Sequence, residues 1–478
     1  MLRTLLSLTL LICMDAVLAQ TWRRTYGGYA SDDAAAVHQL ADEGFLVVGT
    51  TGSFGNGASD IYVLRLDAMG EPIWTRTYGG PGVDVGVDVE PMDDGFILLG
   101  QTSNGDIGGY DLRLIRIDAS GEVLWQNDHG TTEWDLVEAI DISADHLFLT
   151  GRTYGHGCSS GCAFVMKLDM DGDEVWTYTA GGGSSSHGRA VTALSDGTAV
   201  MAGTVSDGFN DKNGLILKVN ADGDEAWFEI FGGSQDDELR DLIATSSDAL
   251  VAVGSTRSMG DFENAWLVSV DQEGSEIWQR DFGAGAADAS LSAIVERSVG
   301  GFAVTGYNTL NLGERDMILT VLDHEGWFQF GSNYGNGHPA DGHDLFETFD
   351  GGYVVSGWAE GYGPGIRAAY VVRTDSALTT TSLDVTPFFD PVSVPTHHRS
   401  TFSFHPNPVT AGSVLNIKTN ENTSLRFITL TDLSGRVVAQ ERCTGCNNYA
   451  VPQLARGVYH ITVEFSDGIR IGQPLLID

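Results

Sequence analysis

A motif that returns about every 51 residues constrains the fold of this chain more than any other feature. Seven tryptophans mark it, at successive intervals of 52, 51, 51, 51, 51 and 49 residues: Trp22, Trp74, Trp125, Trp176, Trp227, Trp278 and Trp327. Seven glycines keep the same period, each after an apolar run: Gly49, Gly100, Gly151, Gly203, Gly254, Gly306 and Gly357. A period of this size indicates a repeat architecture, here with seven copies.

Each copy contains four short segments rich in β-branched and aromatic residues, bounded by Gly, Asp and Asn, which is typical of strands joined by hairpins. In the first copy we expect strands at residues 35–40, 44–51, 61–66 and 73–78. Six copies place Asp or Asn at the start of the third turn and Gly three residues later: Asp67, Asp118, Asp169, Asn220, Asp271 and Asp323. This is the preference of a type I turn, so these side chains are expected to be structural.

Four-stranded units of this size cannot bury both of their faces alone, and radial closure of the seven copies solves this problem. We therefore predict an all-β fold, with a seven-bladed β-propeller at residues 20–375 and tryptophan rings between neighbouring blades. The first tryptophan strand precedes the first glycine strand, and none follows the last third strand. Residues 20–26 should therefore complete the last blade by pairing antiparallel with residues 370–374.

The two ends of the chain indicate export. Residues 1–19 have the basic start, the apolar run and the small residue before the cut that define a cleavable signal peptide. No later segment has the 18 or so apolar residues of a membrane span. Residues 376–401 are rich in Thr, Ser and Pro and are predicted to be a linker. Residues 402–478 form a separate domain.

Two resemblances to known families support this division. The unit Trp-x-x-x-Tyr-Gly-Gly with Asp-x-x-Gly-x-x-x-Trp resembles the tandem propeller repeats of exported proteins in Bacteroidetes-type bacteria. The C-terminal segment resembles the type A sorting domain of the type IX secretion system through seven motif residues: Pro406, Asn407, Pro408, Gly435, Leu454, Gly457 and Tyr459. This resemblance implies a small β-sandwich, the type IX secretion machinery as a partner, and a secreted or outer-surface location.

The net charge limits the binding partners of this chain, and the spacing of its cysteines suggests how they pair. The formal net charge of -39 repels phosphates and anionic lipids, so nucleic acid is excluded as a partner, whereas cations are favoured. Four cysteines follow the signal, in the close pairs Cys158 with Cys162 and Cys443 with Cys446. Export favours two local disulfides, with free thiols or a metal as the alternatives.

One loop position carries an acid in nearly every copy. Six residues after an aromatic-Gly-Gly type of opening, or seven in the last copy, stand Asp32, Asp84, Asp135, Asp237, Asp288 and Asp341, and the fourth copy has Ser186 there. If these acids converge near the propeller axis, they could hold a metal ion such as calcium. The alternative interpretation, which we favour, is that each acid caps its own loop.

The sequence contains no Gly-x-Ser-x-Gly elbow, no His-Glu-x-x-His pair and no phosphate-binding loop. We therefore assign no catalytic residue and no organic cofactor. A binding, adhesion or scaffold module for an unknown glycan or protein ligand should show sevenfold repetition at its site. A hydrolase or lyase acting on polysaccharide or peptide should instead gather unlike residues from several blades. The repetition of the loop acids favours the binding module.

Overall fold

The computed structural model describes residues 21–381 apart from 106, 144, 181–183, 207–210, 284–286, 310–313, 336 and 364. Towards the C-terminus it describes residues 383–385, 392–393, 402–405, 409–419, 425–431, 436–442, 448–465 and 470–477. All regular secondary structure in these residues is strand. The chain divides into two compact units between Val394 and Pro395. The signal peptide expected at residues 1–19 lies outside the described residues.

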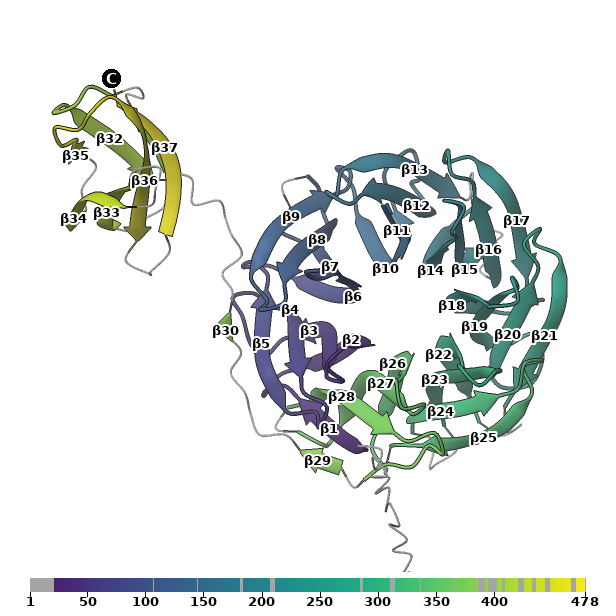
Figure 1. Cartoon of the computed structure of the whole chain (residues 1–478). Coiled ribbons are helices and arrows are strands. Elements are labelled where there is room, and N and C mark those ends of the chain that lie inside the picture. The colour runs from purple at the N-terminus through teal and green to yellow at the C-terminus, as the bar shows by residue number, and fades with distance from the viewer. Residues whose placement is uncertain are drawn as a thin grey trace, which may run out of the picture. The chain divides into compact units, whose positions relative to one another are not determined.

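The first unit is a seven-bladed β-propeller, which confirms the predicted fold (Figure 1). The innermost strands of the blades are β2 (Asp32–Gln39), β6 (Asp84–Met92), β10 (Asp135–Ser143), β14 (Ser186–Ala193), β18 (Asp237–Ala244), β22 (Ala289–Glu296) and β26 (Ala340–Glu347). The second strands are β3 (Phe45–Thr51), β7 (Gly95–Thr102), β11 (His146–Thr153), β15 (Ala199–Ser206), β19 (Leu250–Thr256), β23 (Phe302–Asn308) and β27 (Tyr353–Glu360). The innermost strand of the first blade thus begins three residues before the predicted start, at Asp32.

Two further strands complete each blade towards the outside. The third strands are β4 (Asp60–Leu66), β8 (Asp111–Asp118), β12 (Cys162–Asp169), β16 (Lys212–Val219), β20 (Asn264–Val270), β24 (Asp316–Leu322) and β28 (Arg367–Thr374). The fourth strands are β5 (Pro72–Tyr78), β9 (Val123–His129), β13 (Glu174–Ala180), β17 (Glu225–Phe231), β21 (Glu276–Phe282), β25 (Phe328–Asn333) and, for the last blade, β1 (Trp22–Tyr26).

The ring closes as predicted. Strand β1 pairs antiparallel with β28, with Trp22 opposite Arg373 and Tyr26 opposite Ala369. Its side chains enter the core between the last and the first blade, where Trp22 and Tyr26 are each 4% exposed. The N-terminal strand therefore supplies the contact that joins the two ends of the propeller.

Described residues after the last third strand pair with the propeller. Asp375 accepts hydrogen bonds from the amides of Ala377 and Thr379, as Asp67 does from Met69 and Glu71 in the first blade. A seventh copy of the turn is thus present inside the expected linker. The short strands β29 (Leu383–Val385) and β30 (Val392–Ser393) follow and pair parallel with β1 and β5 as fifth strands.

The tryptophans pack between blades, with one correction to the predicted series. The indole Nε1 of Trp22, Trp176 and Trp227 donates to a carbonyl oxygen in the turn of the next blade, at 3.0 to 3.1 Å. In the sixth blade, Phe330 opposite Val321 occupies the tryptophan position. Trp327 stands three residues earlier in the turn and is 53% exposed, so its place in the predicted series is wrong.

A β-bulge in every innermost strand explains the recurring glycines. The pairing with the second strand skips one residue in each blade: Ala35, Val87, Glu138, Arg189, Arg240, Ser292 and His343. The recurring glycine of the second strand lies opposite the residue before the bulge, and a Cβ on Gly254 would come within 2.0 Å of the carbonyl oxygen of Glu238. Glycine therefore permits the bulged backbone to approach its neighbour.

The second unit is a small β-sandwich, as predicted. One sheet contains β31 (Phe402–His405), β32 (Val414–Thr419) and β35 (Asn448–Ala450). The other contains β34 (Val437–Arg442), β33 (Leu425–Thr431), β36 (Gly457–Phe465) and β37 (Arg470–Ile477), in that spatial order. Buried apolar residues of both sheets, among them Leu415, Ile428 and Ile461, form its own core.

Candidate functional site

Four of the six recurring acids are the first residues of innermost strands: Asp32, Asp84, Asp135 and Asp237. Each carboxylate accepts a hydrogen bond from the backbone amide four residues earlier, at 2.6 to 2.8 Å. A Cβ on Gly27 would lie 2.4 Å from the carboxylate of Asp32, so the aromatic-Gly-Gly opening makes room for the acid. These bonds are those of a side chain that caps its own loop.

The other two acids occupy different positions. Ala289 and Ala340 begin the innermost strands of the sixth and seventh blades. Asp288 therefore lies one residue before the strand start, and Asp341 lies one residue after it. Asp288 accepts a hydrogen bond from the amide of Glu263 at 3.0 Å, and Asp341 pairs with Arg315 at 3.1 Å. No group of three or more His, Cys, Asp or Glu in the described part of the chain could hold a metal ion. Calcium binding stays a prediction.

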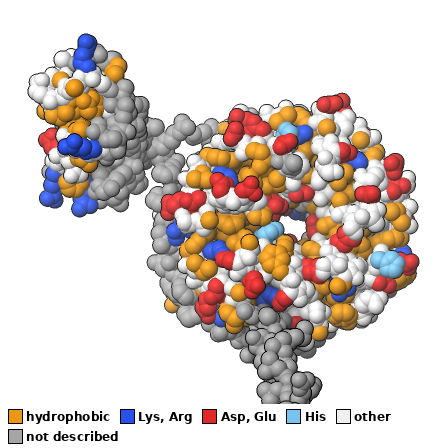
Figure 2. Space-filling view, in the orientation of Figure 1, with side chains coloured by type: hydrophobic (Ala, Val, Ile, Leu, Met, Phe, Trp, Pro, Cys, Tyr) orange, Lys and Arg blue, Asp and Glu red, His pale blue; other side chains and the backbone are white. Residues whose placement is uncertain are grey.

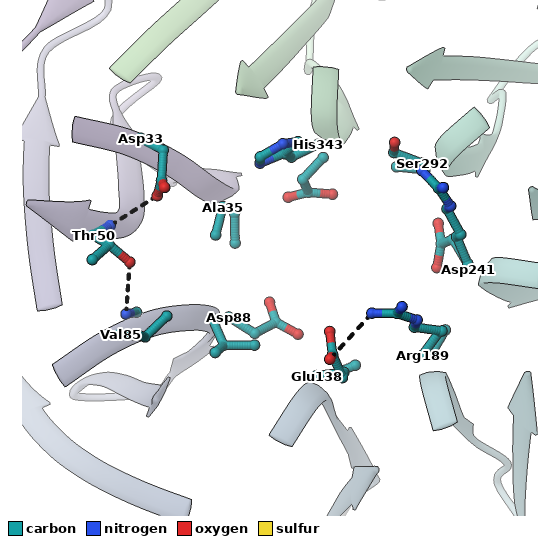
Figure 3. A pocket seen from close by; sticks show the side chains of 18 of the residues that line it. Asp33, Ala35, Thr50, Val85, Asp88, Glu138, Arg189, Asp241, Ser292 and His343 are labelled. Carbon is teal, nitrogen blue, oxygen red and sulfur yellow. Dashed lines mark hydrogen bonds and ion pairs between the residues drawn. The ribbon is translucent and has the colours of Figure 1, made fainter. Parts of the chain in front are cut away.

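Other residues of the seven innermost strands do converge, in the central channel that these strands enclose. A cavity of about 580 Å³ is lined by all seven bulge residues and by the seven residues that follow them. The bulge ring consists of Ala35, Val87, Glu138, Arg189, Arg240, Ser292 and His343. The following ring consists of Ala36, Asp88, Ala139, Ala190, Asp241, Ala293 and Asp344. Figure 2 shows the opening of the channel, and Figure 3 shows side chains from different blades facing one centre.

The bulge ring does not repeat from blade to blade. It contains one acid, two arginines, one serine, one histidine and two small apolar residues, although the strands that carry them repeat closely. Bulges near functional sites commonly redirect a side chain. Here the skipped residue lacks a ladder partner and lines the cavity, so its identity is free to vary without loss of the sheet.

The acids of the following ring join neighbouring blades. Asp88 accepts hydrogen bonds from the amide of Val89 at 2.8 Å and from Ile140 of the next blade at 3.1 Å. Asp241 accepts hydrogen bonds in the same way from the amide of Leu242, at 2.7 Å, and from that of Ile294 in the next blade, at 2.8 Å. The innermost strands are sheet edges with unpaired amides, and these carboxylates bridge them across the blade boundary.

Asp344 makes the corresponding bridge where the ring closes. It accepts hydrogen bonds from the amide of Leu345 at 2.7 Å and from Val37 of the first blade at 2.8 Å. Asp141, two residues after Ala139 in β10, makes a similar bridge. It accepts hydrogen bonds from the amide of Ile142 at 2.7 Å and from Ala193 of the fourth blade at 2.8 Å. Both oxygens of these acids are therefore engaged with backbone amides.

Burial changes the protonation of the bridging acids. Burial and, to a smaller extent, the nearby charge of Asp344 raise the pKa of Asp88 to about 8, although the two amide hydrogen bonds oppose this rise. For the same main reason the pKa of Asp344 is about 7 and that of Asp241 is about 6. At neutral pH Asp88 is therefore mostly protonated, although the protein as a whole is strongly acidic.

A pH-dependent stability follows from these values. The folded pKa of Asp88 lies above its ordinary value of 3.8, so its contribution to stability is complete below about pH 4 and is lost as the pH rises through about 8. We expect the free energy of unfolding to fall by about 3 kcal/mol more for the native chain than for Asp88→Asn between about pH 5.5 and about pH 8. Denaturant unfolding at both pH values measures this.

The matched control for that experiment is Asp222→Asn, which removes an exposed acid of a turn. It should keep the pH dependence of the native chain. If Asp88→Asn and Asp222→Asn behave alike, burial does not hold the Asp88 proton in the channel.

The other titratable groups of the cavity are Asp33, Glu138, Arg189, Arg240 and His343. Burial raises the pKa of Asp33 to about 6, although a hydrogen bond from the amide of Thr50, at 3.1 Å, opposes this rise. Glu138 pairs with His187 at 2.8 Å and with Arg189 at 3.2 Å. Arg240 pairs with Glu238 at 3.3 Å. Burial and, to a smaller extent, the positive charges of Arg367 and Arg240 lower the pKa of His343 to about 4, so this imidazole is neutral at neutral pH.

The other predicted site residues lie elsewhere. A disulfide, with Cα atoms 5.5 Å apart, joins Cys158 in the loop before β12 to Cys162, the first residue of that strand. Among the sorting-motif residues, Gly457 begins β36, Leu454 packs against the sandwich core, and the hydroxyl of Tyr459 donates to the carbonyl of Ala455 at 3.0 Å. The remaining candidates, Pro406, Asn407, Pro408, Gly435, Cys443 and Cys446, lie outside the described residues.

The fold therefore defines a seven-bladed propeller followed by a separate sandwich domain. Residues 403–476 match the family model described as secretion system C-terminal sorting domain. The C-terminal unit is thus a type IX sorting domain, and the protein is exported to the cell surface or the medium. No helix in the described segments is long and apolar enough to span a membrane.

Comparison with curated proteins finds no match to the sequence. Among solved structures, an extracellular domain assigned to the hybrid two component system BT3049 of B. thetaiotaomicron is 11% identical, with a TM-score of 0.44, over 96% of this chain and 57% of that one. A variant of puromycin hydrolase is 13% identical, with a TM-score of 0.49, over 90% and 58%. Sqt1 from Chaetomium thermophilum is 11% identical, with a TM-score of 0.44, over 77% and 86%. This chain spans a little over half the length of the first two.

Sequence reasoning selected the repeated acids and missed the channel residues. The bulge ring holds six residue types in seven blades, so no periodic pattern reveals it. One signal was available in the recurring glycine, because an isolated glycine within a strand indicates a bulge or a close backbone approach. Locating the bulge opposite each glycine would have pointed to these seven positions.

Proposed function

We propose that the propeller is a ligand-binding module of an exported protein and that it takes a small polar group into its channel. The observation that supports a channel site is the bulge ring, in which repeating strands hold unlike polar side chains around a cavity of about 580 Å³. The hydrogen bonds of Asp88 are what favours binding over catalysis there. Cavities of roughly 300–1,000 Å³ with a few convergent polar groups are the usual size of small-molecule sites. The ligand is a free molecule or the end of a glycan or peptide chain.

The second candidate is a hydrolase or lyase acting on polysaccharide or peptide. Unlike residues from several blades are the pattern expected of such an enzyme, so the mixture of Glu138, Ser292 and His343 in one cavity favours it. The raised pKa of Asp88 also suits a general acid. Against it, both oxygens of Asp88 accept backbone amide bonds. An acid held in this way joins blades and is poorly placed to transfer a proton to a substrate, so we favour binding.

The test is a binding screen of the mature chain against glycans and peptides, combined with a variant that fills the channel. Ala35→Phe places a large ring in the cavity, whereas Ala41→Phe places the same ring on the exposed loop between β2 and β3. We expect at least one ligand whose affinity falls about tenfold or more in Ala35→Phe and is unchanged in Ala41→Phe. A ligand that binds both variants equally would contradict the channel site, and turnover of a ligand would favour the enzyme.

A further inference from the structure

Two arginines occupy the same position on adjacent innermost strands. Arg189 is the bulge residue of β14 and Arg240 that of β18, and both line the channel cavity. Figure 3 shows Arg189 reaching towards the centre from its strand. Each side chain is 32% exposed, so both guanidinium groups are reachable from the cavity.

Most of the hydrogen-bonding capacity of these two groups is unused. A guanidinium has five N–H donors. Among the described residues, Arg189 pairs only with Glu138, at 3.2 Å, and its Nε is buried with no partner. Arg240 pairs within the same residues only with Glu238, at 3.3 Å.

Arg113 shows what a saturated arginine looks like in the same propeller. Its guanidinium bonds both oxygens of Asp128 at 2.8 and 2.7 Å and one oxygen of Asp84 at 2.9 Å. It is 6% exposed and lies within one blade, where it has a structural role. The contrast indicates that Arg189 and Arg240 are not held by the fold in this way.

The acids of the cavity, in contrast to the two arginines, have most of their hydrogen-bonding capacity occupied by protein groups. Asp88, Asp241 and Asp344 each accept two backbone amide bonds. Asp33, which also lines the cavity, accepts one from Thr50 at 3.1 Å. Glu138 is shared between His187 and Arg189. The donors of the two arginines are therefore the larger unsatisfied capacity of the site, and carboxylates match guanidinium donors in geometry and charge.

We infer that Arg189 and Arg240 bind the carboxylate of the ligand, so that the channel is selective for a small organic acid. This inference rests on the proposed channel site. The net charge of -39 opposes the approach of a long polyanion, which favours a monomer or a chain end. A sugar acid and the C-terminal carboxylate of a peptide share this chemistry, and the test distinguishes them.

The experiment is calorimetric titration of the mature chain with two pairs of probes. Galacturonic acid is compared with galactose, and N-acetyl-dialanine with its C-terminal amide. We expect one acid to bind at least about tenfold more tightly than its neutral counterpart, since a charge-assisted bidentate contact is lost in the neutral molecule. The pair that shows the difference identifies the source of the carboxylate.

Matched variants assign the effect to the two arginines. Arg189→Gln and Arg240→Gln should each weaken binding of that acid about tenfold and should reduce its preference over the neutral probe. Arg257→Gln, on an exposed side chain paired with Glu263, should leave binding unchanged. Melting temperatures within a few degrees of the native chain exclude unfolding as the cause.

Three outcomes would overturn the inference: equal binding of an acid and its neutral counterpart, unchanged acid binding in both arginine variants, or no acid binding at millimolar concentration. If the neutral probe binds and Ala35→Phe abolishes that binding, the channel site stands and only its selectivity for acids fails. If Ala35→Phe affects no binding, the proposed function itself fails.

Discussion

A mature chain that lacks residues 20–26 is expected to unfold about 10 °C or more below the intact chain. The deletion removes β1, which fills the fourth position of the last blade and buries Trp22 and Tyr26 between the two ends of the ring. Loss of one large buried aromatic side chain costs about 3–5 kcal/mol, and 1 kcal/mol shifts the melting temperature by about 2 °C in a domain of this size. The deletion also exposes the edge of β28. Thermal unfolding of both chains measures the difference.

A rescue variant tests whether closure, and not merely chain length, is the cause. Residues 20–26 are moved to replace residues 380–386, so that Trp22 follows Asp375 by seven residues, as Trp74 follows Asp67. The seventh turn is already formed at Asp375, so the strand should enter the last blade directly. We expect most of the lost stability to return. An unchanged melting temperature after the deletion would contradict the closure argument.

The substitution Gly254→Ala is expected to destabilise the propeller by about 3 kcal/mol, because overpacking of this kind has no space to relax. The new Cβ would stand 2.0 Å from the backbone carbonyl oxygen of Glu238, and the two residues belong to paired strands. The same contact holds the bulge that presents Arg240 to the cavity. Denaturant unfolding should therefore show a lower midpoint, and binding of any channel ligand should weaken as well.

The matched control is Gly80→Ala, in the loop before β6. Its new Cβ would come no nearer than 3.4 Å to the side chain of Asn104, which is an ordinary contact. We expect a change below about 1 kcal/mol there. If the two variants are equally stable, the recurring glycine does not serve the bulge.

The loop acids illustrate why sequence repetition does not by itself identify a binding site. Asp32 and Asp237 recur because each strand start needs a cap, and their carboxylates are occupied by amides and hydroxyls of their own blades. The fourth blade has Ser186 at this position, and its hydroxyl accepts a hydrogen bond from the amide of Ala163 and donates one to the carbonyl of Ala180. A demand of the fold is repeated in every blade, whereas a ligand contacts each blade at a different angle and selects a different residue there.

The sequence by itself determined the number of blades, the turn aspartates, the closing strand and the sorting domain. These features depend on local patterns: strand length, turn chemistry and a period that can be counted along the chain. Only the tertiary structure decided which residues line the channel cavity together. Arg189, His343 and Asp88 are far apart in sequence and converge only when the ring closes. The bulge in each innermost strand then sets which side chain faces the cavity, because a one-residue shift in a strand reverses the direction of every side chain that follows.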